Sequence, residues 1–226
     1  GFDWEEIDAE DPFSGIGYWG DHQIVYLLRL IKTLRAFEPK VLDKWLDERA
    51  FVFANVPYRI KSMEAIFDNP QSTITFDADF SAQLRLQAEE EGSDGALLKT
   101  ANASIHKANL TEKILIPALV KLSNFVPGGG IWMNTERPEW NDANNALVGY
   151  GLSMVTTGHL LRYLEFCREW WSELDHDKQV FLSAPVAEFV DSLLPIFTNR
   201  ETDPSICTRD DTLRAQVVLS LIHISE

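Results

Sequence analysis

The stretch of residues 127–152 constrains the fold most, because it interrupts a chain whose other segments have helical periodicity. It reads PGGGIWMNTERPEWNDANNALVGYGL and holds three successive glycines, two tryptophans and four asparagines. Glycine reaches backbone angles that are closed to other residues, so the chain can turn sharply here and let a ligand approach the main chain. Pro138 disfavours a helical conformation of the residue before it, and Asn141 or Asp142 can cap a following helix. We therefore predict a loop that carries functional side chains and leads into a helix.

Most of the remaining chain has apolar residues at helical spacing. Asn109 and Glu112 have the spacing of a capping box at the start of one such segment. Residues 51–59 are apolar and β-prone but contain Pro57, so they predict at most an isolated strand or an extended loop. The predicted fold class is all-α with long loops, and the expected helices cover residues 21–37, 39–46, 62–67, 79–91, 109–125, 142–174, 178–199 and 211–218.

Composition excludes several classes of function. With 226 residues, 45% of them hydrophobic, the chain can bury the core of one domain. Its 35 acidic residues outnumber its 20 Lys and Arg, and the resulting charge of -15 argues against nucleic acid as a partner. No apolar run approaches the roughly 20 residues of a membrane span and no signal-peptide pattern opens the chain, so we expect a cytoplasmic protein without a membrane partner.

The cysteines and two of the histidines show no metal-binding pattern. Cys167 and Cys207 have neither metal-ligand nor disulfide spacing, and we interpret them as packing residues. His106 and His159 have no second ligand at metal spacing, so a structural role is expected for both. No metal site and no cofactor are predicted.

Glu139 and Asp142 are two carboxylates three residues apart, with Trp140 between them. A pair of acids beside an aromatic face suits glycosidic bond cleavage, in which one acid protonates the leaving oxygen and the ring stacks on the sugar. Asp142, as a helix cap, would be held in its ionised form by N–H donors and the helix dipole. Glu139 precedes the cap and is the better general acid. The alternative is that Asp142 only caps the helix and Glu139 is an ordinary loop carboxylate.

A second candidate segment is residues 18–23, Tyr-Trp-Gly-Asp-His-Gln. Asp21 and His22 could bind sugar hydroxyls while Trp19 forms a floor beneath the ring. Equally, Asp21 could be an ordinary N-cap and His22 a surface residue of the first helical turn. The hypothesis of one shared site requires both segments to meet at the same end of the helices. Its members are Trp19, Asp21, His22, Trp132, Arg137, Glu139, Trp140, Asn141, Asp142 and Asn145.

The run Glu139-Trp140-Asn141-Asp142 resembles the Asp-Trp-Asn-Asp element of cellobiose and chitobiose phosphorylases. Their catalytic domain is an (α/α)6 barrel, which glucoamylases and trehalases share. The first acid of the element is the proton donor in that family, which implies this role for Glu139. Residues 17–23 are similar in character to the loop that holds the nonreducing-end sugar in such barrels, which implies that Asp21 binds substrate.

This resemblance implies an incomplete (α/α)6 toroid and an enzyme that cleaves glycosidic bonds of oligosaccharides with inversion. Glutamate stands where the family has aspartate, which moves the carboxyl group by one methylene, and no phosphate site is recognisable. Hydrolysis, and phosphorolysis with inorganic phosphate, therefore both remain open. The alternative is a non-catalytic carbohydrate-binding protein or a helical scaffold, although a scaffold does not need the glycines, tryptophans and clustered asparagines.

Both ends of the chain look cut. Gly1 leads directly into a run of acidic residues, so a targeting segment would lie upstream of it. Residues 219–226, LSLIHISE, resemble the translation of a transposase adapter used to prepare DNA libraries. We therefore expect residues 1–218 to be a partial (α/α)6 catalytic domain and residues 219–226 to be an adapter-derived tail.

Overall fold

The computed structural model describes residues 21–126, 128–134, 147–174 and 179–198. Within these ranges the chain forms seven α-helices and three small antiparallel sheets, so the fold is mixed rather than all-α. The prediction of an incomplete (α/α)6 toroid is therefore wrong. It failed because the strands are only two or three residues long, too short for a period of two to stand out from the flanking sequence.

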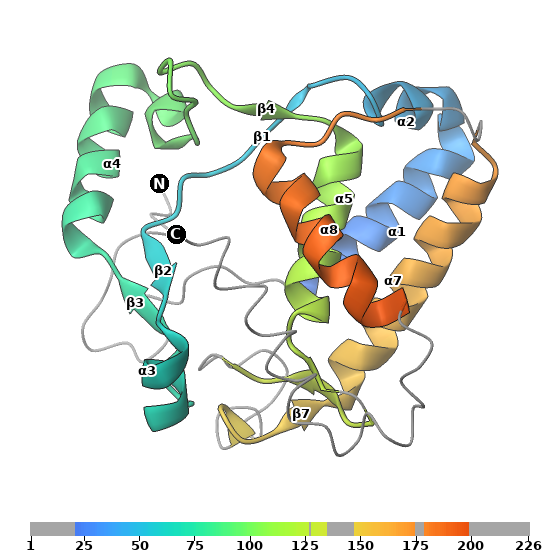
Figure 1. The fold of residues 1–226 in the computed structure, drawn as a ribbon. Helices are drawn as coiled ribbons and strands as arrows, with labels where there is room; N and C mark the ends of the chain where they lie inside the picture. Colours follow the sequence, from blue (N-terminus) through green and yellow to red (C-terminus); the bar gives the residue numbers. More distant parts are fainter. Residues whose placement is uncertain (1–20, 127, 135–146, 175–178, 199–226) are drawn as a thin grey trace.

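The helices follow the expected order (Figure 1). They are α1 (Asp21–Phe37), α2 (Pro39–Trp45), α3 (Met63–Asp68), α4 (Ala78–Glu91), α5 (Leu110–Leu122), α7 (Met154–Ser172) and α8 (Ala184–Thr198). A short 3-10 helix, η1 (Ser93–Ala96), follows α4. The predicted bounds of the helices at 21–37, 39–46 and 79–91 are confirmed to within one residue, because each is delimited by a local signal such as Pro39 or Asp77.

The strands pair in three separate sheets. β1 (Phe51–Val52) pairs with β4 (Lys107–Ala108), and β2 (Tyr58–Ile60) pairs with β3 (Ile74–Phe76). The third sheet has the order β5 (Phe125–Val126), β6 (Gly130–Trp132) and β7 (Leu152–Ser153). This third sheet joins the end of α5 to the start of α7, and it lies at the lower end of the molecule in Figure 1.

The main core lies among α1, α2, α5 and α7. Ile24, Leu28 and Ile31 of α1 are buried on one face, as their spacing predicts, and they pack in one cluster with residues such as Tyr163 and Trp170 of α7. The hydroxyl of Tyr163 donates a hydrogen bond to the Ile114 carbonyl at 2.9 Å, so this buried polar atom is satisfied. A smaller cluster joins α5 to α8.

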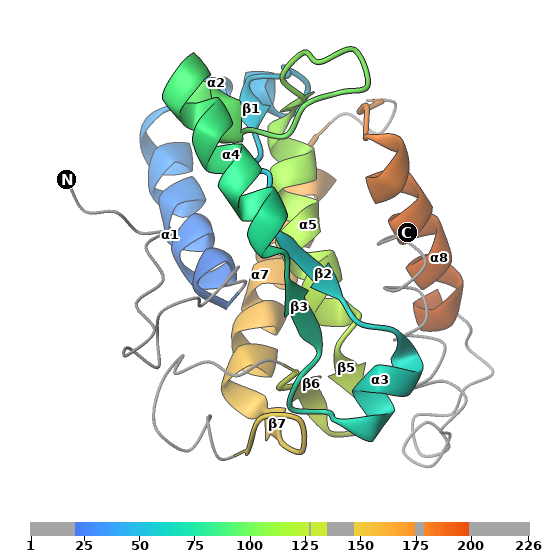
Figure 2. The same cartoon turned by 90° about the vertical axis from the view of Figure 1, so that its left-hand side faces the viewer.

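The second layer contains α3, α4, β2 and β3, on the left of Figure 1 and in front in Figure 2. Near the third sheet, this layer contacts the rest of the molecule at Gly149, whose φ is +80° and which lies against Pro70. A Cβ atom at Gly149 would lie 2.5 Å from the carbonyl oxygen of Pro70, so only glycine permits this close approach.

Two long helices differ from their predicted bounds. The helix expected over 142–174 is interrupted, because Leu147 is helical but a turn and β7 follow it before α7 begins at Met154. Ser153 caps α7 by accepting from the Thr156 N–H. The helix expected over 178–199 begins at Ala184. Pro185 is therefore in its first turn, where proline is well tolerated, and does not bend it.

Candidate functional site

The three successive glycines form the turn of a β-hairpin rather than an open loop. Val126 pairs with Gly130, and the Gly129 N–H donates to the Val126 carbonyl at 2.9 Å. A Cβ atom at Gly129 would lie 2.3 Å from Cδ1 of Leu152, and one at Gly130 would lie 2.9 Å from Oγ1 of Thr157. These glycines thus let the hairpin pack against β7 and α7, which is a structural reason for them that the sequence did not indicate.

The same sheet holds both flanks of residues 135–146. On the N-terminal flank, Met133 donates from its N–H to the Gly151 carbonyl at 3.0 Å. The Met133 carbonyl accepts from the Gly149 N–H at 2.6 Å. The indole Nε1 of Trp132 donates to the Gly149 carbonyl at 3.0 Å. Main-chain and side-chain bonds therefore cross directly from one flank to the other.

Asn134, the last described residue before 135–146, is held from two further directions. Its Nδ2 donates to Oδ1 of Asn124 at 2.9 Å, and its carbonyl accepts from the hydroxyl of Thr73. Asn124 follows the end of α5, whereas Thr73 belongs to the second layer just before β3. The segment that carries the candidate acids therefore leaves from a point where three parts of the fold meet.

The start of α1 and the flanks of residues 135–146 lie toward the same end of the helical bundle. α1 and α7 run parallel, because Arg35 near the end of α1 pairs with Glu173 just after α7, and Nζ of Lys32 lies 5.3 Å from the ring centroid of Phe166. α7 starts directly after β7 of the third sheet. The start of α1 at Asp21 therefore points toward the end that carries this sheet, as Figure 1 shows.

Of the ten predicted site residues, only the side chain of Trp132 falls within the part that the structure describes. It is half-buried, and its N–H bond to Gly149 gives it a role in holding the sheet besides any contact with a ligand. Asp21 and His22 are the first two residues of α1. The predictions for Trp19, Arg137, Glu139, Trp140, Asn141, Asp142 and Asn145 lie outside the described residues.

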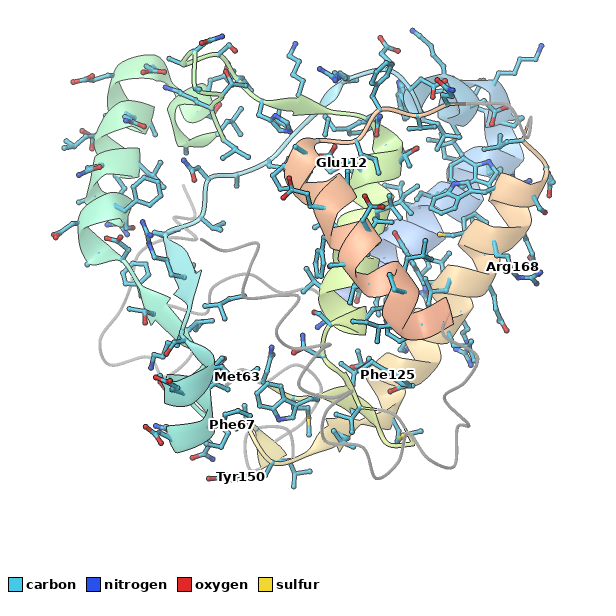
Figure 3. The ribbon with its side chains drawn as sticks, in the orientation of Figure 1. Met63, Phe67, Glu112, Phe125, Tyr150 and Arg168 are labelled. Atoms are coloured by element: carbon cyan, nitrogen blue, oxygen red, sulfur yellow. The ribbon has the colours of Figure 1, made fainter. Side chains whose placement is uncertain are left out.

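Outside this site, the buried carboxylate of Glu112 makes a tertiary contact that the sequence did not indicate. Glu112 is only 3% exposed, and its two oxygens accept from the N–H of Ser183 at 2.8 Å and its hydroxyl at 2.9 Å. Nε2 of His106 lies 3.6 Å from the same carboxylate. The Asn109 half of the predicted capping box is confirmed, since Asn109 Oδ1 accepts from the Glu112 N–H at 2.9 Å. The Glu112 half is wrong, because this side chain instead binds the start of α8 (Figure 3).

Two further groups have altered acidity. Burial lowers the pKa of the Lys113 ammonium, against the opposing charge of Glu112, and its Nζ lies 3.6 Å from the centroid of the Phe53 ring. Burial also raises the pKa of the Cys167 thiol to about 12, so this cysteine is a neutral packing residue. The prediction that Cys167 serves packing is confirmed.

Over the described ranges, no three acidic, histidine or cysteine side chains are grouped closely enough to hold a metal ion. In the same part of the chain, every helix is too short or too polar to cross a bilayer. No known protein family and no curated protein matches the chain in sequence.

Proposed function

We propose that this protein cleaves glycosidic bonds of oligosaccharides with inversion, and that Glu139 is the general acid. The observation that supports the proposal concerns the described neighbours of the two candidate segments. Trp19 comes shortly before the start of α1, and Glu139 lies between the two anchored flanks of 135–146. The start of α1 and these flanks lie toward the same end of the bundle. A sugar-binding segment and an acid-bearing segment must adjoin in this way to serve one bond.

The assignment of roles rests on the chemistry of the two acids. A general acid must hold a proton near neutral pH. Loss of hydration beside a tryptophan raises the pKa of a glutamate and so favours its protonated form. Asp142 is close to Glu139 in sequence, whereas an inverting base must sit about 6.5 to 9.5 Å away on the opposite face of the sugar. We therefore assign Asp142 to positioning of the sugar and expect the base from outside this element.

Support for this function comes from the acid-aromatic sequence element and from the hydrogen bonds that hold the flanks of 135–146, not from the barrel fold of the enzymes that the element resembles. Because the fold is mixed, an (α/α)6 barrel no longer supports this function. The attacking group is water in a hydrolase and inorganic phosphate in a phosphorylase, and the proposal covers both.

The test is the dependence of Glu139→Gln on the leaving group. Glutamine keeps the shape of the side chain but cannot donate the proton, so kcat on an oligosaccharide should fall about 10²- to 10⁴-fold. An activated aryl glycoside, whose leaving group needs little protonation, should lose much less. Steady-state kinetics with both substrates, with and without phosphate, measures this difference and identifies the attacking group.

The control variant is Glu169→Gln, an exposed glutamate of α7 far along the helix from the third sheet, which should behave as the wild type. Equal losses on both substrates, or leaving-group dependence in Asp142→Asn instead, would show that Glu139 is not the acid. Oligosaccharide binding without any turnover by the wild type would favour the non-catalytic carbohydrate-binding alternative.

A further inference from the structure

The second layer meets the third sheet through two neighbouring contacts. The hydroxyl of Thr73, a residue that is only 3% exposed, donates to the Asn134 carbonyl. The Pro70 carbonyl lies against Gly149, where a Cβ atom would approach its oxygen to 2.5 Å. Both contacts are made to one unit, because the carbonyl of Met133, which precedes Asn134, accepts from the Gly149 N–H at 2.6 Å. One short segment of the layer is thus fastened to the sheet.

At its other end, the second layer joins the bundle through two paired segments of chain. Residues 53–55, which lead into the layer, pair with residues 96–98, which leave it. The Leu98 N–H, for example, donates to the Phe53 carbonyl at 2.8 Å. We call these two segments the neck. β1, which directly precedes the neck, lies toward the top of both Figure 1 and Figure 2, whereas α3 lies toward the bottom. The neck and the contact at Thr73 are therefore at opposite ends of the layer.

The apolar clusters of the described residues do not extend from the bundle into the second layer. Neither cluster has a member in α3, α4, β2 or β3. Ile66 and Leu84, which are the buried apolar residues of those helices, belong to neither. Shared burial of apolar surface is the main reason why two parts of a protein unfold together. In the described part of the chain, no such shared cluster ties the layer to the bundle.

The elements within the second layer, by contrast, are bonded to one another. Lys61 donates from its N–H to the Thr73 carbonyl at 2.8 Å, which extends the β2–β3 ladder, and its Nζ donates to Oγ of Ser72 at 2.6 Å. Asp77 joins β3 to α4, because its carboxylate accepts from the Phe80 N–H at 2.9 Å. These bonds favour movement of the layer as one body.

We propose that the second layer opens from the bundle as one body about the neck, and that the hydrogen bond from Thr73 to Asn134 is the latch that keeps it closed. Opening breaks this bond and the contact at Gly149 but leaves both apolar clusters intact. A part that detaches without breaking a shared core opens at a lower free energy than the whole protein unfolds. Its opening uncovers the third sheet at Asn134 and Gly149, whether or not the protein is a glycosidase.

The first experiment is native-state hydrogen exchange with peptide resolution in Thr73→Val, Thr73→Ser and Thr75→Val. Valine keeps the shape of threonine but removes the donor, serine keeps the donor, and Thr75 is an exposed threonine of β3. Thr73→Val leaves the Asn134 carbonyl without this donor, so the slowest amides of β2, β3 and α4 should together exchange about 5- to 10-fold faster. In Thr73→Ser and Thr75→Val the same amides should stay within about twofold of the wild type.

The matching variant in the bundle is Tyr163→Phe, which removes the hydrogen bond to the Ile114 carbonyl. It should speed the exchange of the slowest amides of α5 and α7 about 5- to 10-fold. The slowest amides of β2, β3 and α4 should stay within about twofold of the wild type, because the bundle remains folded while the layer is open. This comparison distinguishes separate opening of the layer from unfolding of the whole protein.

Exchange of the wild type in low concentrations of urea tests the proposal without any substitution. The slowest amides of β2, β3 and α4 should share one dependence on urea, shallower than that of α7, because their opening exposes less surface. The proposal is overturned if one dependence on urea covers both layers, or if Tyr163→Phe speeds exchange in both layers equally. It is also overturned if α4 exchanges as slowly in Thr73→Val as in Thr75→Val.

Discussion

At the scale of single residues, buried polar groups carry most of the tertiary specificity near the start of α5. The Glu112 carboxylate accepts from both donors of Ser183, its N–H and its hydroxyl, and Asn109 donates from Nδ2 to the Phe181 carbonyl at 2.6 Å. These bonds place the start of α8 beside the start of α5. Hydrogen bonds to a charged group contribute more than neutral ones, so Glu112 is the most consequential of these residues.

We predict that Glu112→Ala destabilises the fold by about 3 kcal/mol, because it leaves the N–H and hydroxyl of Ser183 without their acceptor. Glu169→Ala, at an exposed position of α7, should change the free energy of unfolding by less than about 0.5 kcal/mol. Urea denaturation measures both values. A loss under about 1 kcal/mol in Glu112→Ala would mean that water or another group replaces the carboxylate.

Cys167 predicts a specific dependence of stability on pH. Burial raises the pKa of its thiol from the ordinary value of 9.0 to about 12 in the folded protein, because the charged form is excluded from the core. Between pH 9 and 12 the unfolded chain therefore loses this proton while the folded protein keeps it. The free energy of unfolding should fall by about 1.4 kcal/mol per pH unit in that window, with no contribution from this group below pH 9.

The measurement is urea denaturation of the wild type and Cys167→Ala at pH 8, 9 and 10. Both proteins lose stability from other titrating groups, so only the difference between their slopes reports the thiol. The wild type should lose more stability than Cys167→Ala between pH 9 and 10. Parallel slopes would show that the thiol ionises with equal ease in the folded state.

At the scale of elements, two glycines in neighbouring segments have opposite roles. Gly149 has a φ of +80° and lies against the Pro70 carbonyl at the junction of the two layers. Gly158 lies within α7, and a Cβ atom there would meet nothing within 4 Å. The same substitution therefore tests a tertiary constraint at one position and helix propensity at the other.

We predict that Gly158→Ala stabilises the protein by about 1 kcal/mol through helix propensity. Gly149→Ala should destabilise it by about 2 kcal/mol or more, from the left-handed backbone and the contact with Pro70. Thermal melts of the two variants decide this, since the melting temperature should rise in one and fall in the other. A fall in both would mean that Gly158 serves a packing contact.

At the scale of the whole molecule, the two layers differ in how much apolar surface they bury. α7 buries six residues, among them Tyr163, Phe166 and Trp170, whereas α4 buries only Leu84. α4 is nevertheless pressed against η1, where a Cβ atom at Gly95 would lie 2.3 Å from the Gln87 carbonyl oxygen. Local stability follows buried apolar contacts, so the layers should not open with the same free energy.

We predict that amides of α4 exchange with solvent deuterium faster than those of α5 and α7, by about tenfold or more in protection factor. The reason is that opening the second layer exposes less apolar surface than opening the bundle. Native-state hydrogen exchange with peptide resolution measures this order. Equal protection of α4 and α7 would indicate a single cooperative unit instead.

The sequence by itself determined the helices whose ends are set by residues close to them in the chain. Apolar spacing and Pro39 set α1 and α2, and Asn109 caps α5 as its spacing predicts. It also indicated that Cys167 is a packing residue. These features depend on neighbours within one or two turns, which a single sequence displays directly.

Only the tertiary structure decided the sheets, the break between Leu147 and α7, and the anchoring of Asn134. Ile131 pairs with Ser153, and Thr73 reaches Asn134, so each depends on a partner far away in the sequence. Strands of two or three residues are too short for their periodicity to be recognised in the sequence. The sequence also does not distinguish a buried threonine from an exposed one, because its hydrogen-bond acceptor lies far away in the chain. Gly129 and Gly130 illustrate the difference, since the sequence predicts a sharp turn there and only the neighbouring Leu152 and Thr157 show how closely the hairpin packs.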